Sequence, residues 1–162
     1  MDEPAFWAII DASRPSGGDV HDHAAALQER LKPLGAQEII SFDEHLSIQL
    51  VRAYSWDLWG AAAIINGGCS DEGFESFRGW LILQGQQIFE RALREPDSLA
   101  EVVSEPDVEC EDVLYAPLHA YEAVAGKEIP HAGPEQPVDP SGRSWEESDL
   151  EARFPRLTGV FG

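Results

Sequence analysis

The feature that most constrains the fold is residues 54–84, YSWDLWGAAAIINGGCSDEGFESFRGWLILQ. Helical patterns lie on both sides of a break at residues 66–69, NGGC. Glycine adopts the positive φ of a helix C-cap at little cost, which suits Gly67. A serine such as Ser70 caps the following helix by accepting from its first backbone N–H groups. The stretch therefore predicts a central antiparallel helical hairpin.

Two charged residues of this stretch stand among apolar neighbours. Asp57 and Arg78 lie about equally far from the predicted turn, so an antiparallel hairpin would bring them to the same level. A buried charge is costly unless it is paired, and arginine suits a bidentate pair with a carboxylate. We therefore expect a structural ion pair between Asp57 and Arg78.

Apolar residues recur at helical spacing over most of the chain. A pattern with spacings of three and four runs through Phe42, Leu46, Leu50, Tyr54, Leu58, Ala61 and Ile65. The helical pattern begins near Ala36, and one continuous helix from there to Ile65 would measure about 45 Å, so we expect a break between Ala53 and Trp56. Further helices are predicted over residues 2–13, 20–31 and 109–125. No stretch shows the alternation of a strand.

The length and these patterns predict one domain. At 162 residues with 43% hydrophobic side chains, the chain can bury a substantial core. We expect an all-α fold over residues 1–162, with about six to seven helices around the central hairpin. Residues 126–143 are rich in proline and glycine, which is typical of an irregular surface loop.

The net charge restricts the possible partners. Thirty acidic against eleven basic residues give −19, and residues 95–151 alone hold sixteen acids and two bases, a net −14. Binding to a phosphate backbone is not expected, because it requires concentrated Lys and Arg. No apolar run has the roughly 20 residues that a membrane span needs. The acidic start and two cysteines favour the cytoplasm and no disulfide framework.

Several side chains near the turn are candidates for a ligand site, although no motif for a cofactor is present. The candidate ligand-binding residues are Trp59, Asn66, Cys69, Asp71 and Arg78. Cys69 precedes a helix N-terminus, which lowers a thiol pKa, but no histidine adjoins it in sequence. His21 and His23 point apart on a helix and have no further ligands nearby in sequence, so no metal site is predicted.

The central stretch, with FERALREPDSLA and ECEDVLYAPLHAYE after it, resembles a bacterial family of uncharacterised proteins catalogued as a domain of unknown function. FWAIIDASR and SWEESDLEARFPRL also fit the pattern of that family. The resemblance implies a compact cytoplasmic protein and brings no catalytic residues. A weaker resemblance links the chain to acidic DNA-mimic and immunity proteins. It depends on Asn66, Gly67 and Gly68 being followed by Phe74, Phe77 and Gly85, with residues 69–72 as an insertion.

Two functions remain open at this level. The first is a non-enzymatic binding protein, immunity-like or regulatory, whose acidic face from residues 95–151 engages a basic partner. The second is a small-molecule binder or enzyme with a site at the turn of the central hairpin, where Asn66 and Cys69 lie.

Overall fold

The computed structural model describes all of residues 1–162 and is built from helices, with one isolated bridge between Ser55 and Ser141. The α-helices are α1 (Glu3–Ala12), α2 (Val20–Leu31), α3 (Ala36–Arg52), α4 (Trp56–Asn66), α5 (Asp71–Leu83), α6 (Gln86–Arg94), α7 (Asp112–Ala125), α8 (Leu150–Arg153) and α9 (Pro155–Phe161). The 3₁₀ helices are η1 (Lys32–Leu34), η2 (Pro96–Glu101) and η3 (Glu147–Asp149). The all-α prediction is confirmed, with more and shorter helices than expected.

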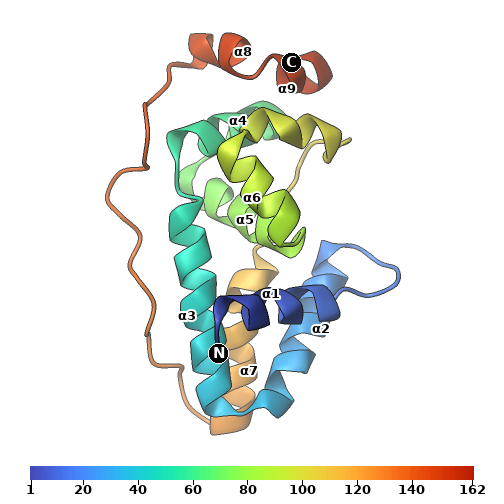
Figure 1. Ribbon diagram of the computed structural model, residues 1–162, viewed down its shortest axis with the longest axis vertical. Helices are drawn as coiled ribbons and strands as arrows, with labels where there is room; N and C mark the ends of the chain where they lie inside the picture. The colour runs from blue at the N-terminus through green and yellow to red at the C-terminus, as the bar shows by residue number, and fades with distance from the viewer.

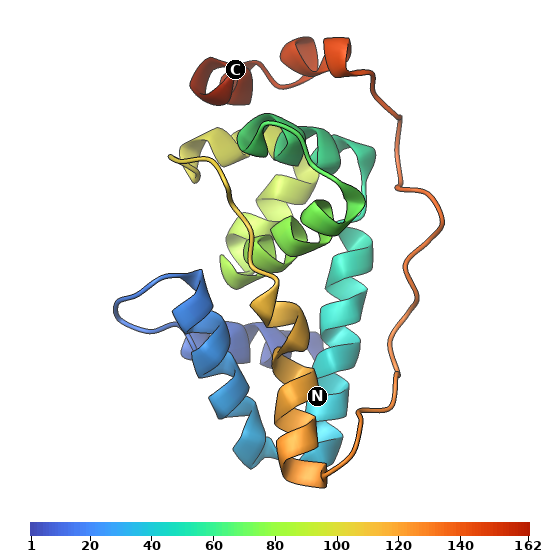
Figure 2. The ribbon, with the colours of Figure 1, turned by 180° about the vertical axis from the view of Figure 1, so that it is seen from behind.

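The helices form two groups, one above the other (Figures 1 and 2). In the lower group, α2 and α3 both pack against α7, and α1 lies across them. The upper group contains α4, α5, α6 and η2, and α8 and α9 cover α4 at the far end. Helix α5 contacts α2, α3 and α7 and so joins the two groups.

Two breaks in helical patterns, at residues 53–55 and at the α4–α5 turn, fall where the sequence places them. The long apolar pattern divides into α3 and α4 at residues 53–55, and Ser55 caps α4 by accepting from the Leu58 N–H. Gly85 separates α5 from α6. Its φ of +100° takes the backbone out of the helical conformation, and glycine suits this position because that φ is strained for residues with a side chain. Gly67 adopts the left-handed C-cap of α4, and Ser70 caps α5.

The prediction of an ion pair between Asp57 and Arg78 is wrong, because the two helices of the α4–α5 hairpin are offset in register. Trp59 in the N-terminal half of α4 stacks on Phe74 in the first turn of α5, with ring centroids 5.2 Å apart. Asp57 is exposed and pairs with Arg153 of α8. Because the chain breaks before α4, the apolar stripe of α3 does not continue to Asp57.

Arg78 is 1% exposed, and its hydrogen-bond partners are uncharged. Its guanidinium donates to the carbonyl oxygens of Phe74 and Leu50, at 2.7 Å for Leu50, and to Gln136 Oε1 at 3.0 Å. The rings of Tyr54 and Phe74 lie 4.8 and 4.7 Å from the guanidinium carbon. Carbonyl dipoles and aromatic faces therefore surround the cation where a carboxylate was expected.

Residues 126–146 are irregular, which includes the loop expected over residues 126–143 and extends three residues beyond it. They lead from the end of α7 along the outside of the molecule toward α8 (Figure 1). The segment is fixed to the helices at several points. The Ser141 N–H donates to the Tyr54 carbonyl, and Trp145 Nε1 donates to the Trp56 carbonyl. None of the helices has the length and apolar character that crossing a membrane requires.

Candidate functional site

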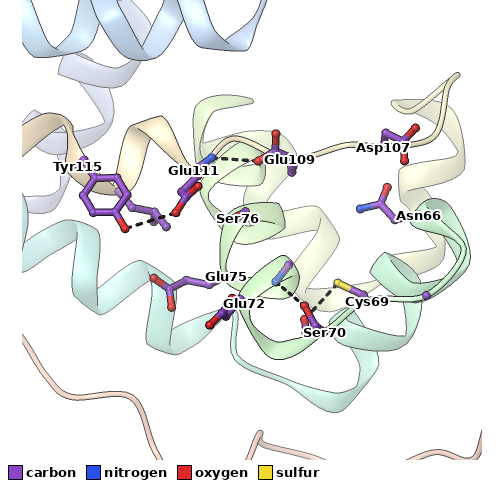
Figure 3. A pocket seen from close by; sticks show the side chains of 13 residues that line it. Asn66, Cys69, Ser70, Glu72, Glu75, Ser76, Asp107, Glu109, Glu111 and Tyr115 are labelled. Atoms are coloured by element: carbon purple, nitrogen blue, oxygen red, sulfur yellow. Dashed lines mark hydrogen bonds between the residues drawn. The ribbon is translucent and has the colours of Figure 1, made fainter.

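The α4–α5 turn and the chain before α7 enclose a groove of about 720 Å³ (Figure 3). One side comes from the turn and the first two turns of α5, and the other from residues 107–115. The lining residues are Asn66, Gly68, Cys69, Ser70, Glu72, Gly73, Glu75, Ser76, Asp107, Glu109, Glu111, Leu114 and Tyr115. We call this surface the acidic groove. It joins residues from both regions that the sequence analysis singled out.

The lining of the acidic groove is strongly negative. Its acidic residues are Glu72, Glu75, Asp107, Glu109 and Glu111, and it includes no Lys, Arg or His. Tyr115 is 44% exposed and donates from its hydroxyl to Glu111 at 3.4 Å. The pKa of Tyr115 is raised, first by the charge of Glu111, with Glu75 and Glu72 adding to it. The negative charges of the groove therefore act on Tyr115, and they would attract a cation that enters the groove.

Hydrogen bonds to its backbone fix the segment of residues 107–111, which carries three of these acids. Asn66 Nδ2 donates to the Val108 carbonyl at 3.0 Å, and Asn66 Oδ1 accepts from the Val108 N–H at 2.8 Å. Two residues on, the Cys110 N–H donates to the Ser76 carbonyl of α5 at 2.9 Å. Asn66 thus positions the segment on both sides of Val108, as a neighbouring strand would.

Cys69 borders the acidic groove but is poorly suited to nucleophilic catalysis. Burial raises the pKa of its thiol to about 11, although nearby Arg78 acts in the opposite direction. Its Sγ lies 3.6 Å from the Ser70 carbonyl oxygen. A thiol with so high a pKa is protonated at neutral pH and reacts slowly. Cys69 also borders a second cavity of about 480 Å³, which includes Ile64 and Leu150 in its lining.

The other three predicted ligand residues lie outside the groove lining. Trp59 Nε1 donates to the Cys69 carbonyl at 2.8 Å, which closes the α4–α5 connection. Asp71 begins α5 and accepts from the Tyr54 hydroxyl at 3.5 Å. Arg78 is buried. Among the five predicted residues, the structure brings only Asn66 and Cys69 to the groove.

Sequence reasoning missed Glu72 and Glu75 as members of the same surface. Both are exposed residues of α5 and lie three residues apart, so they share one face of that helix. That spacing was available in the sequence. The pairing of this face with residues 107–111 was not, because it depends on the Asn66–Val108 hydrogen bonds between segments 42 residues apart.

Fold and site together define an all-α protein with an acidic groove. Residues 1–123 match the family described as "Protein of unknown function (DUF4240)", and the chain belongs to that family. The match ends within α7, so the irregular segment and the C-terminal helices lie beyond it. No curated protein and no solved structure matches the chain.

Proposed function

We propose that the protein is a non-enzymatic binding module that receives a basic segment of a partner protein in the acidic groove. The observation that carries this proposal is a concave surface with five acidic residues and no basic one. Carboxylates gathered in a concavity focus a negative potential, which attracts cations from a distance and speeds association. A nucleic-acid backbone would be repelled by the same potential.

The apolar part of the lining suits lysine and arginine side chains. Leu114 and the exposed ring of Tyr115 provide surface for their aliphatic stems, and an aromatic face attracts their charged ends. Catalysis at the turn is less favoured, because Cys69 has a raised pKa and the lining contains no histidine that could act as its base.

Substitutions that remove negative charges without changing side-chain size test this proposal. The triple variant Glu72→Gln, Glu75→Gln, Glu109→Gln removes three groove charges, and Glu122→Gln, Glu128→Gln, Glu135→Gln removes three exposed charges elsewhere. The probe is a synthetic peptide rich in Lys and Arg, and its Kd is measured by calorimetry at low and moderate salt. Exposed charge pairs contribute about 0.2–1 kcal/mol each, so the groove variant should bind about tenfold more weakly.

The matched control has the same net charge as the groove variant and should bind within about twofold of the wild type. Equal weakening in both variants would mean that the peptide responds to overall charge, and the proposal would fail. A wild-type protein that does not bind the peptide even at low salt would also overturn it.

A further inference from the structure

Three side chains that can ligate a metal ion meet where α2 and α7 begin, outside the acidic groove. His21 Nδ1, Cys110 Sγ and a carboxylate oxygen of Asp112 all lie within 4.8 Å of one another. His21 Nδ1 is 2.9 Å from Asp112 Oδ2. Zinc bonds to nitrogen, sulfur and oxygen at about 2.0–2.3 Å, which places tetrahedral donors roughly 3–4 Å apart. A small inward movement of the thiol would complete such a set.

The three donors come from two well-anchored parts of the chain, the start of α2 and residues 110–112 at the start of α7. His21 lies in the first turn of α2, and Asp112 is the first residue of α7, which packs against α2. Cys110 is fixed through its N–H bond to Ser76, and its Sγ lies 3.7 Å from the Val20 carbonyl oxygen. The donors therefore approach one another from directions that the fold sets, as a metal site requires.

Gly79 allows the close packing that places Cys110. A Cβ atom at Gly79 would lie 2.7 Å from the Cys110 carbonyl oxygen and 2.7 Å from Val113 Cγ1. Cys110 is fully buried, whereas the side chains of His21 and Asp112 are 50% and 61% exposed. Those two side chains border a small cavity of about 230 Å³. Solvent therefore cannot reach the cluster at the Cys110 thiol but can reach it from the side of His21 and Asp112.

We infer that His21, Cys110 and Asp112 form a binding site for a divalent transition-metal ion, with zinc the best match. Imidazole, thiolate and carboxylate are ligands that zinc accepts together, whereas magnesium and calcium require oxygen donors. One thiolate and one carboxylate balance the two charges of the ion. Burial raises the pKa of the Cys110 thiol to about 11, so the ion has to displace its proton, which passes to solvent. The proton that His21 Nδ1 shares with Asp112 moves to Nε2. A fourth position remains open to water or a small ligand.

Sequence spacing could not reveal this site. His21 is 91 residues from Asp112 in the sequence, and His23, two residues after His21, does not belong to the cluster. His23 is buried and directs Nε2 to the Ile10 carbonyl oxygen at 2.8 Å. None of its three residues lines the acidic groove, although Cys110 and Asp112 belong to the segment that carries Glu109 and Glu111.

The test is titration of the tag-free protein with Zn²⁺ by calorimetry and with Co²⁺ by absorption spectroscopy. We expect one ion per chain, and a thiolate-to-cobalt charge-transfer band. Cys110→Ala should abolish that band, and Asp112→Asn and His21→Gln should each weaken Zn²⁺ affinity by about 100-fold or more, since even outer-shell losses cost 10–100-fold. The controls Cys69→Ser and His131→Gln should bind as the wild type does.

Asp112 and His21 are partly exposed, so their variants keep the test valid if Cys110→Ala fails to fold. Absence of the charge-transfer band in the wild type would overturn the inference. So would equal Zn²⁺ affinity in the wild type and both exposed variants, since the cluster would then serve only to hydrogen-bond α2 to α7.

Discussion

Arg78 shows how a buried cation is accommodated without a carboxylate at bonding distance. The Leu50 carbonyl that accepts from it belongs to the last turn of α3, where the helix dipole is negative. Burial lowers the pKa of Arg78, and the nearby charges of Glu75 and Asp71 oppose that change. Arginine remains protonated under these conditions. The side chain thereby connects α3, α5 and, through Gln136, the irregular segment.

We predict that Arg78→Ala lowers the free energy of unfolding by about 3 kcal/mol or more, since it leaves a cavity and unpaired buried acceptors. Arg78→Lys should cost less, because it keeps a cation but cannot donate in all three directions. Urea unfolding measures both losses. A cost below about 1 kcal/mol for Arg78→Ala would contradict the connecting role.

His23 predicts a pH dependence of stability. Its pKa lies below the ordinary value of 6.5, mainly because burial disfavours the charged ring, and Arg14 adds to this effect. The unfolded chain therefore takes up a proton more readily than the folded one. It follows that stability is retained above pH 6.5 and falls as the pH drops below it.

Urea unfolding at pH 7 and pH 5 tests this dependence with His23→Gln as the non-titrating reference. The wild type should lose more stability over this range than the variant does, although His21 has a raised pKa beside Asp112 and changes stability in the opposite direction in both proteins. Equal losses in the two proteins would show that His23 does not titrate differently on folding.

At the scale of helices, local signals fixed where elements begin and end. Gly67 and Ser70 act within one turn of their own positions, and so their roles could be predicted. The register between α4 and α5 could not, because it depends on the stacking of Trp59 on Phe74 and on the helices packed around them. Counting residues from the turn assumed a level hairpin and led to the wrong partner for Asp57.

Helix α4 packs against the C-terminal helices at Gly60. A Cβ atom there would lie 2.8 Å from Phe154 Cε2 and 3.0 Å from Leu150 Cδ2. Replacing glycine by alanine in a helix normally stabilises it by about 1 kcal/mol. We predict that Gly60→Ala destabilises the protein instead, and that limited proteolysis then cuts faster within residues 144–162.

The control for this prediction is Gly159→Ala in α9, where a new Cβ meets nothing within 4 Å. It should leave unfolding and proteolysis unchanged or slightly improved. If Gly60→Ala proves as stable as the wild type, the contact between α4 and the C-terminal helices is looser than the packing indicates.

For the whole molecule, charge and fold class could be read from the sequence, but the shape of the acidic surface could not. The sequence assigned the acidic face to residues 95–151 as a block. In the structure, Asp107, Glu109 and Glu111 of this block meet Glu72 and Glu75 of α5, while Glu122 and Glu128 lie at the other end of α7 and beyond it. Every groove acid lies within the part of the chain that matches the family.

The most direct test of the acidic groove is to map the Lys- and Arg-rich peptide on the protein by backbone amide chemical shifts during a titration. We predict that the largest shifts fall on residues 68–76 and 107–115, with little change over residues 122–135. Shifts of similar size over both regions, or shifts confined to residues 122–135, would contradict a binding site in the groove.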